Sequence, residues 1–365
     1  MTIKPQVLFI GKPNTNTQEY KTFSSRFECI HYKVTSLAQL LEDFQTKFRY
    51  IEAIYAGWGG FDSVGGFHGE VLRMAPPNLK IIAICSIGYD GFDLEGMQKK
   101  GIILTNVPSQ IASEAVADLV LYNTLSSFRN FKIFEQNMKG KLTHTGVLRT
   151  SLVHGKFDQF HGEAVVRPVT GNIFASSCCG REILSPRGHN VVIVGFGSIG
   201  KLVGQRLSSI GMNIHYVTRN KLSAAEEMDL GYKVNYHETL KSARDVVDLL
   251  VIACPGTPST RHMIDRQMIE DISKPFRLIN IGRGYIVDEN ALIEGLQSGK
   301  ILFAGLDVFE NEPSIHPDLL NRQDVVLTPH IGSSTTENFD YTAATAMQNI
   351  EAVLFDTQEK INSVN

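Results

Sequence analysis

Arg283, Glu312 and His330 each follow an apolar run of the chain, within the sequences NIGRG, GLDVFENEP and LTPHIGSS. In an open α/β sheet the carboxyl ends of the parallel strands meet at one edge, where ligands bind. If the three runs are strands of one sheet, we expect these side chains to converge there. Taken singly, each has an ordinary explanation: a surface ion pair, a helix start before a proline and a buried core histidine.

Together, these side-chain types suit the reduction of a ketone. A guanidinium can hold and polarise a 2-oxo acid through its carboxylate and ketone oxygens, and a histidine can protonate the ketone oxygen as hydride reaches the carbon. A carboxylate that accepts a hydrogen bond from the histidine ring favours the imidazolium and raises its pKa. We therefore predict Arg283 and His330 as catalytic and substrate-binding residues, with Glu310 or Glu312, both close to Pro313, as the histidine partner.

A glycine-rich turn precedes all three segments. The β-branched run at 191–194 leads into a GxGxxG sequence, and an apolar helical pattern follows it. The first glycine permits the tight turn, the second lets a pyrophosphate approach the main chain, and the third lets the helix pack closely on the strand. The helix N-terminus then faces the diphosphate. The predicted dinucleotide contacts in this turn are Gly195, Phe196, Gly197, Ser198, Ile199 and Gly200.

The end of the next strand predicts which dinucleotide binds. An Asp or Glu is expected there when the ribose carries a free 2′-hydroxyl, but Glu226 and Glu227 already belong to the following helix. Cations and hydroxyls suit a 2′-phosphate, so we predict a preference for NADP(H), with NAD(H) possible. The alternative is a merely solvated loop. The residues at the strand end are Thr218, Arg219, Asn220 and Lys221.

The length and composition predict a globular protein with two domains. The chain has 365 residues, of which 43% are hydrophobic and 20% charged, enough for two domains with separate cores. A formal net charge of -3 favours neither nucleic acid nor an anionic membrane as a partner. The longest apolar runs, such as 246–254, are shorter than the roughly 20 residues of a membrane helix.

The cysteines point to a reducing compartment, and the histidine spacing predicts no metal site in the protein. Five cysteines form no C-x-x-C pair and leave at least one thiol free, so we predict a cytoplasmic protein. The start of the chain has too short an apolar core for a secretory signal. His144, His154 and His161 match no familiar zinc or iron spacing, so no metal is predicted.

Strand-like and helix-like segments alternate along the chain, which is typical of parallel sheets built from βαβ units. A first group of strands is expected at 7–10, 53–56, 81–85 and 102–105, and a second group at 191–194, 214–217, 249–253, 277–281, 303–308 and 325–327. Helical spacing predicts long helices at 112–128 and 340–355. The stretch 139–173 has no sustained period and is interpreted as a surface excursion or partly disordered loop, or as an arm that reaches a partner subunit.

In this order, the motifs resemble the D-isomer-specific 2-hydroxy-acid dehydrogenase family, and most of all its glyoxylate and hydroxypyruvate reductase branch. The resemblance covers most of the chain. It begins with CSIGYDGFD at Cys85 and NVP at Asn106, continues through SEAVAD at Ser113, and includes CPGTP at Cys254 and TRH at Thr260. Asp118 stands where the family usually has Glu, and the 139–173 stretch is longer than usual.

The resemblance implies two Rossmann-like lobes with doubly wound parallel sheets. Residues 1–109 and 335–365 would form the substrate domain, and residues 110–334 an inserted dinucleotide-binding domain. It also implies a homodimer that reduces small 2-oxo acids, such as glyoxylate or hydroxypyruvate, to D-2-hydroxy acids. Two alternatives stay open: a reductase of branched 2-oxo acids, and a dinucleotide-sensing protein of the corepressor type.

The resemblance also assigns roles to individual residues. It implies Arg283 as the substrate-orienting cation, Glu312 as the histidine partner and His330 as the acid/base, while the main-chain amides near Ile87 and Gly88 receive the substrate carboxylate. Trp58, in a glycine-rich loop, is expected either to border the substrate site or to pack in a core. The remaining cofactor contacts are expected at Cys254, Pro255, Thr260, Ile281, Asp307 and Gly332.

Overall fold

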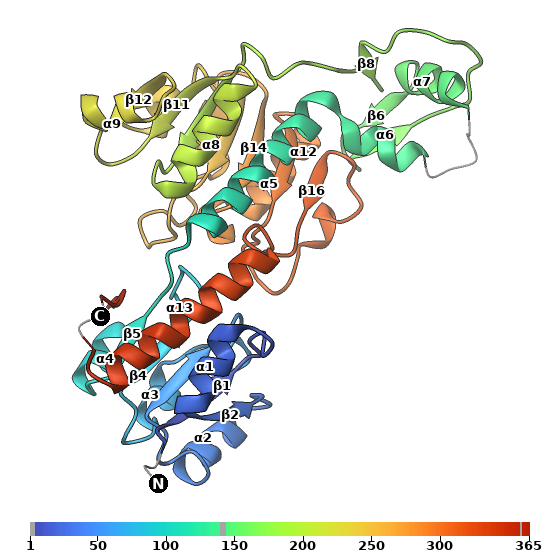
Figure 1. Cartoon of the computed structure of the whole chain (residues 1–365). Coiled ribbons are helices and arrows are strands. Elements are labelled where there is room, and N and C mark those ends of the chain that lie inside the picture. Colours follow the sequence, from blue (N-terminus) through green and yellow to red (C-terminus); the bar gives the residue numbers. More distant parts are fainter. Residues whose placement is uncertain (1–3, 139–143, 358–359) are drawn as a thin grey trace. The chain divides into compact units, whose positions relative to one another are not determined.

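The computed structural model describes residues 4–138, 144–357 and 360–365. The chain forms two compact units, one from residues 1–112 and 334–365 and the other from residues 113–333, so that the second is inserted between the two segments of the first. Each unit contains a wholly parallel sheet with helices on its faces (Figure 1). This arrangement confirms the predicted α/β class with two Rossmann-like parts.

The first unit is built on a five-stranded sheet in the order β2-β1-β3-β4-β5. Its strands are β1 (Gln6–Ile10), β2 (Glu28–Tyr32), β3 (Ala53–Ala56), β4 (Ile81–Ile84) and β5 (Ile103–Thr105). Its helices are α1 (Gln18–Arg26), α2 (Leu37–Gln45), α3 (Gly69–Arg73), α4 (Leu94–Lys99) and α13 (Thr336–Leu354). Ala343, Met347 and Ile350 of α13 join the core on one face of this sheet, as the helical spacing predicted.

The second unit is built on a seven-stranded sheet in the order β12-β11-β10-β13-β14-β15-β16. Its strands are β10 (Asn190–Val194), β11 (Asn213–Val217), β12 (Val234–His237), β13 (Leu249–Ile252), β14 (Phe276–Asn280), β15 (Ile301–Leu306) and β16 (Val325–Leu327). Its helices include α8 (Ser198–Ser209), α9 (Ala224–Asp229), α10 (Leu240–Ala243), α11 (Arg266–Asp271) and α12 (Glu289–Ser298). The long helix α5 (Gln110–Arg129) runs from the boundary of the first unit into the second.

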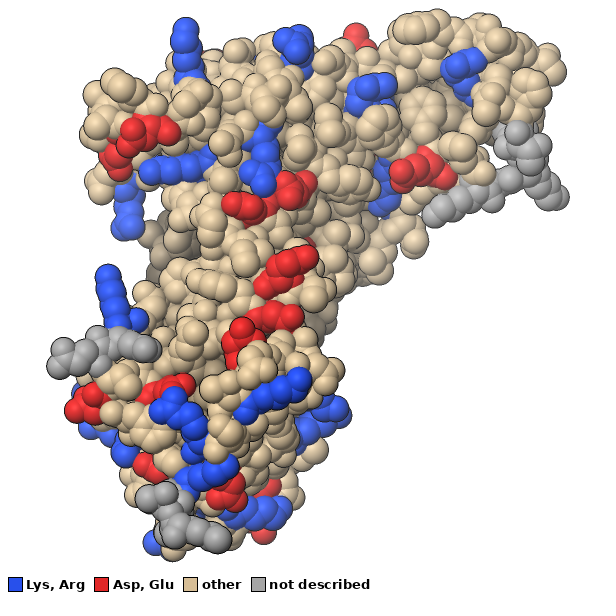
Figure 2. Space-filling view, viewed as in Figure 1, with Lys and Arg blue, Asp and Glu red and all other residues tan. Residues whose placement is uncertain are grey.

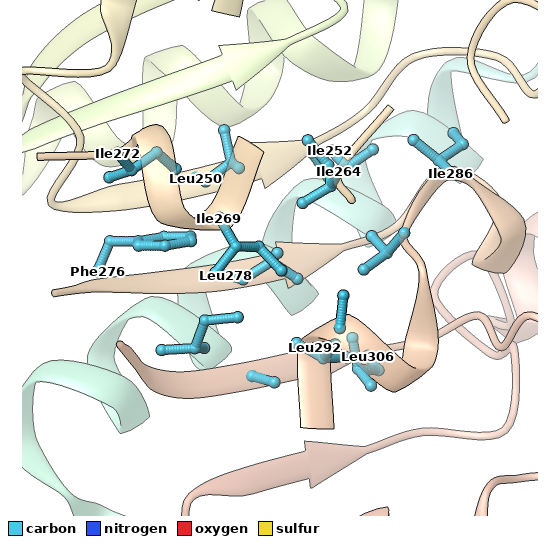
Figure 3. Packing of buried hydrophobic residues seen from close by; sticks show 14 of the residues in the cluster. Leu250, Ile252, Ile264, Ile269, Ile272, Phe276, Leu278, Ile286, Leu292 and Leu306 are labelled. Atoms are coloured by element: carbon cyan, nitrogen blue, oxygen red, sulfur yellow. The ribbon is translucent and has the colours of Figure 1, made fainter. Parts of the chain in front are cut away.

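Apolar side chains on both faces hold the central strands. Figure 3 shows Leu250, Leu278 and Leu306, from three strands of the sheet, packed with Ile269 and Leu292 of two helices. Because helices cover both faces, a central strand such as β13 is buried along its whole length and reads as a continuous apolar run. Burial of each such side chain contributes about 1.5–3 kcal/mol to folding.

Within the two large sheets, the strands β2 and β12 were not expected from the sequence. Both lie at the edge of a sheet, and neither has a fully buried side chain. Their sequences, ECIHY and VNYH, therefore lack the apolar run by which the other strands were predicted.

The stretch predicted as a loop or arm is folded in its described part. Together with its flanks it contains α6 (Phe131–Met138), α7 (Thr145–Val153) and the hairpins β6–β7 (Lys156–Asp158, Glu163–Val165) and β8–β9 (Ser177–Cys178, Arg181–Glu182). We call residues 131–182 the arm; residues 139–143 lie outside the described residues. The arm has its own apolar cluster around Ile133, Leu148 and Leu152, so the interpretation as a partly disordered loop is wrong for its described residues.

Polar contacts join the arm to the seven-stranded sheet. Arg322, which is buried, forms two 2.9 Å contacts with both carboxylate oxygens of Asp324. The same guanidinium donates hydrogen bonds to the main-chain oxygens of Gln159 and Phe160 in the arm. A buried ion pair that is also fully hydrogen-bonded fixes geometry more than it adds stability.

The surface shows a mixture of charges. On the face drawn in Figure 2, acidic and basic side chains are interspersed rather than gathered into one basic patch. Among the helices that the structure describes, none has both the length and the apolar character needed to cross a bilayer.

Candidate active site

The glycine turn joins β10 to α8 through close approaches of the main chain. A Cβ atom on Gly195 would lie 2.6 Å from the Cα of Cys254, and one on Gly200 would lie 2.2 Å from the main-chain oxygen of Gly195. A Cβ atom on Gly197 would meet nothing within 4 Å, so open space lies beside the helix start. Gly197 is the N-cap of α8 and supplies no side-chain acceptor to the first amides of the helix. These amides fit an anionic ligand, and Phe196, Ser198 and Ile199 complete the turn.

The segment after β11 is ordered by Tyr216. Its hydroxyl donates to Glu227 Oε1 at 3.1 Å and accepts the N–H of Leu222 at 3.2 Å. Glu226 is used in the capping box with Ser223 at the start of α9. Both acidic side chains nearest the strand end therefore have structural partners.

The cations at this strand end have no such partners. Arg219, Asn220 and Lys221 are exposed, and Thr218 is half-buried with its carbonyl accepting a 3.4 Å hydrogen bond from Tyr236. Neither Arg219 nor Lys221 forms an ion pair with any residue that the structure describes. Their positive charges are therefore available to a ligand.

The loop after β13 is closed by threonine hydroxyls. Thr260 Oγ1 donates to the Pro255 oxygen at 3.0 Å and accepts the N–H of Thr257 at 2.8 Å. Burial raises the pKa of Cys254 to about 11, so its thiol stays protonated near neutral pH. Pro255 is exposed, and the turn of β10 passes directly beside Cys254.

The loop after β14 is shaped by its own polar groups. Asn280 Oδ1 accepts the N–H of Gly282 at 3.1 Å, and Asn280 Nδ2 donates to the Arg283 oxygen at 3.0 Å. The Arg283 guanidinium donates to the Gly282 oxygen at 2.9 Å. Ile281, which directly follows β14, donates its N–H to Ile252 of β13 at 3.1 Å. Arg283 is therefore presented from a turn of defined shape.

The loops that carry Arg283 and Glu312 touch through their main chains. A Cβ atom on Gly284 would lie 1.8 Å from the carbonyl carbon of Phe309, so only glycine fits there. Phe309 in turn donates its N–H to Glu312 Oε1 at 2.9 Å. The two predicted site residues are thus brought to one place by a backbone contact.

Glu312 and His330 form a hydrogen-bonded pair. Glu312 Oε2 lies 3.0 Å from His330 Nδ1. This contact raises the pKa of His330 above its usual value, against the opposing effects of burial and of the Arg283 charge. Burial acts to raise the pKa of Glu312, but the hydrogen bonds from His330 and Phe309 outweigh it and the pKa is lowered. The contact therefore favours the ionised form of Glu312 and the protonated form of His330.

The second ring nitrogen of His330 has no partner among the described residues. His330 Nε2 makes no hydrogen bond to any described residue, and the side chain is 43% exposed. The ring can therefore keep Nδ1 on Glu312 while Nε2 faces a ligand.

Asp307 holds the segment that carries His330. Its Oδ1 accepts bonds from Thr328 Oγ1 at 2.7 Å and from the Ile331 N–H at 2.9 Å, and its Oδ2 accepts the Gly332 N–H at 2.8 Å. His330 itself has a φ of +53°, a left-handed conformation that is unfavourable for most side chains. The buried carboxylate of Asp307 fixes this conformation from both sides.

Glu310 lies apart from the His330 pair. Its Oε1 is 2.5 Å from His262 Nε2. The structure thus separates the two carboxylates that the residues alone left open, and it places Glu312 on His330.

Ile87 and Gly88 lie in the first unit, directly after β4. Asn106 Nδ2 donates to the Ile87 oxygen at 2.7 Å, and Ser86 Oγ donates to the Gly88 oxygen at 2.8 Å. The main-chain N–H groups of Ile87 and Gly88 make no hydrogen bond to described residues, so they remain available to an anionic group.

Three large apolar side chains are exposed at the carboxyl edge of the first sheet. They follow β3 and β4, which pair from Ala53–Ile81 to Ala56–Ile84. Trp58 is 44% exposed, Ile87 42% and Tyr89 40%. The expectation that Trp58 packs in a core is therefore wrong.

The histidines considered as metal ligands have other partners. His144 Nδ1 accepts N–H groups at the start of α7, His154 Nδ1 lies 2.9 Å from the Thr150 oxygen, and His161 pairs with Asp158 at 2.7 Å. Within the described ranges, no group of three or more His, Cys, Asp or Glu side chains is placed to hold a metal ion. Asp118, the shorter carboxylate noted in the sequence analysis, forms an ion pair with Arg206 of α8.

Known proteins resemble this chain along nearly all of its length. Residues 171–332 match the model of the family described as D-isomer specific 2-hydroxyacid dehydrogenase, NAD binding domain. The chain is 33% identical over 337 residues to glyoxylate/hydroxypyruvate reductase B of Yersinia pseudotuberculosis, covering 92% of this chain and 91% of that protein. It is 30% identical over 334 residues to 4-methyl-2-oxopentanoate reductase A of Aspergillus oryzae, covering 91% and 90%.

A solved structure shows the same likeness. The NADPH-dependent glyoxylate/hydroxypyruvate reductase of Sinorhizobium meliloti, in complex with NADP and malonate, superposes with a TM-score of 0.76. It is 28% identical, and the match covers 99% of this chain and 97% of that chain.

Proposed function

Because this chain belongs to the D-isomer-specific 2-hydroxyacid dehydrogenase family, it is a nicotinamide-dependent oxidoreductase, and we propose that it reduces small 2-oxo acids, such as glyoxylate and hydroxypyruvate, to D-2-hydroxy acids. The observation that carries this proposal is the contact between Glu312 and His330, which leaves Nε2 of the ring free. The nearby Arg283 supplies the positive charge that a 2-oxo acid requires.

Each residue of the proposed site has a defined task. NADPH, when bound at the glycine turn, supplies the hydride. Arg283 binds the carboxylate and ketone oxygens of the substrate and polarises the carbonyl. His330 enters as the imidazolium and gives the Nε2 proton to the ketone oxygen, while Glu312 holds the ring through Nδ1. The free amides of Ile87 and Gly88 are proposed to bind the substrate carboxylate.

A steady-state screen tests the activity. NADPH oxidation is followed with a panel of 2-oxo acids, and the chirality of each product is determined from the same samples. We expect turnover with several 2-oxo acids and D products. A protein that binds NADPH but reduces none of them would instead support the dinucleotide-sensing alternative.

His330→Ala tests the proposed proton donor. Loss of a positioned general acid costs about 10²–10⁴-fold in rate, so kcat should fall by that order while the Kd for NADPH stays near that of the wild type. His161→Ala is a matched control, because His161 also pairs with a carboxylate but lies in the arm. Near-normal turnover of the His330 variant would contradict the proposed role of His330 as proton donor.

We also propose that NADPH is preferred over NADH. The support is the pair of unpartnered cations Arg219 and Lys221, together with the engagement of Glu226 and Glu227 in other bonds. A charge-assisted hydrogen bond is worth about 1.5–3 kcal/mol, so the double variant Arg219→Ala and Lys221→Ala should weaken NADPH binding by roughly tenfold or more and leave NADH binding nearly unchanged. Lys241→Ala, another exposed cation of this unit, is the control. Equal kcat/KM values of the wild type with NADPH and NADH would contradict the preference.

A second candidate substrate class is favoured by the exposed apolar side chains Trp58, Ile87 and Tyr89. They follow the neighbouring strands β3 and β4, as the proposed carboxylate-binding amides do, and we propose that they contact a branched 2-oxo acid. Since a methylene or two is worth about 1–3 kcal/mol in such a pocket, Trp58→Ala should reduce kcat/KM for 4-methyl-2-oxopentanoate much more than for glyoxylate. Tyr50→Ala, an exposed aromatic that precedes β3, is the control.

A homodimer is the assembly that we propose, with the arm as the surface for a second copy. The support is the exposure of Phe160 (61%) and Phe174 (90%) on the arm, which has its own apolar cluster. The cytoplasmic location expected from the cysteines stays a prediction.

A further inference from the structure

Glu310 lies where three loops of the second unit meet. The loops follow β13, β14 and β15, three neighbouring strands of the sheet. Glu310 Oε1 is 2.5 Å from His262 Nε2 and 3.5 Å from a guanidinium nitrogen of Arg261, both in the first loop. Glu310 Oε2 accepts the N–H of Glu289, at the end of the second loop, at 3.1 Å. One side chain thus connects all three segments.

The bond between Glu310 and Glu289 is reciprocal. Glu289 Oε1 accepts the N–H of Glu310 at 3.1 Å. Glu289 is the first residue of α12 and is buried. Burial raises the pKa of this carboxyl, and the N–H of Glu310 acts against that rise. Each acidic side chain therefore satisfies the main chain of the other, which fixes the backbone at position 310.

The fixed backbone supports Glu312. Phe309, which precedes Glu310, packs its main chain on Gly284 and donates its N–H to Glu312 Oε1. The peptide group between Phe309 and Glu310 is thus held by the loop after β14, through Gly284 and Glu289. Glu312, two residues further, projects from this frame to His330.

We propose that Glu310 is a positioning residue, which holds Glu312 against His330 and ties the loop after β13 to the same frame through His262. This inference rests on the proposed function for its effect on turnover, but its structural claim does not need turnover. Among the described residues, the hydrogen bonds of Glu310 go to the loops after β13 and β14 rather than to His330, so we expect its effect to pass through Glu312.

Glu310→Gln is the direct test, because it preserves shape but removes the charge and one acceptor. A misplacement of about 1 Å can cost roughly 100-fold in rate, so we expect kcat to fall by about 10-fold to 100-fold, with a smaller change in the Kd for NADPH. Glu294→Gln is the matched control: Glu294 lies on α12 and pairs with Arg266 at the surface. A kcat equal to that of the control would overturn the proposal.

A second measurement does not depend on activity. The His330 imidazole is titrated by NMR in the wild type, Glu310→Gln, Glu312→Gln and the double variant. The charged groups around His330 are Glu312, Asp307 and Arg283. If Glu310 acts by positioning Glu312, Glu310→Gln lowers the pKa of His330 in the wild-type background and has no further effect in the Glu312→Gln background.

The outcomes separate the hypotheses. An equal downward shift in both backgrounds would mean that Glu310 acts on His330 by its charge alone, and would overturn the positioning role. If the wild type reduces no 2-oxo acid but the NMR pattern is as expected, the proposed function fails and the positioning role stands. Should Glu310→Gln fold poorly, His262→Gln removes the same contact from the other side and should lower the pKa of His330 in the same direction.

Discussion

His330 divides its two ring nitrogens between two tasks. Nδ1 is held by Glu312, and Nε2 is left for a ligand. The sequence could predict that Arg283 and His330 follow strands of one parallel sheet, because each comes after an apolar run. It could not separate Glu310 from Glu312, since they are two residues apart and equally close to Pro313. That choice depends on the main-chain bonds of Phe309, Glu289 and Glu310.

The same pair predicts how activity depends on pH. In the proposed mechanism reduction needs the imidazolium, and Glu312 raises the pKa of His330. We therefore expect kcat/KM for reduction to be high below that pKa and to fall as the pH rises through it. Glu312→Gln removes the cause of the rise, so the fall should begin at a lower pH. The measurement is kcat/KM against pH for both proteins, and an unchanged midpoint would contradict the role of Glu312.

At the level of elements, the β10–α8 turn shows two different uses of glycine. Gly200 is needed by the fold, because a side chain would collide with a main-chain oxygen, whereas Gly197 borders open space. The central strands were predictable because they are buried on both faces. The edge strands β2 and β12 and the arm were not, because their burial depends on few or distant neighbours.

These two glycines predict opposite results. Gly200→Ala should lower the free energy of unfolding by about 1–3 kcal/mol, the usual cost of overpacking. Gly197→Ala should fold with nearly normal stability but bind NADPH at least about tenfold more weakly, or about 1.4 kcal/mol. Thermal unfolding with and without NADPH measures both effects. Loss of stability in Gly197→Ala, with normal cofactor binding, would show that the turn is only structural.

At the level of the whole molecule, the chain combines two parallel-sheet units with an arm that carries its own core. The arm could not be predicted as a folded element, because its short helices and hairpins are stabilised by contacts with residues far along the chain, such as Arg322. Its exposed phenylalanines are the basis for the proposed homodimer.

The assembly is tested with Phe160→Asp and Phe174→Asp. A charge on an apolar interface is unfavourable, so sedimentation should show a dimer for the wild type and a shift toward monomer for the two variants. Tyr50→Asp, which changes an exposed aromatic of the other unit, should leave the dimer intact. A wild type that sediments as a monomer would contradict the proposed dimer through the arm.

The close approach of Gly284 to Phe309 has a consequence for protein engineering. An insertion or deletion in either loop would also move the other loop. The positions of Arg283 and Glu312 would therefore change together. Trp58, Ile87 and Tyr89 are exposed and lie in the other unit. Libraries that test the proposed substrate contacts should therefore diversify these three side chains and leave the loops of Gly284 and Phe309 unchanged.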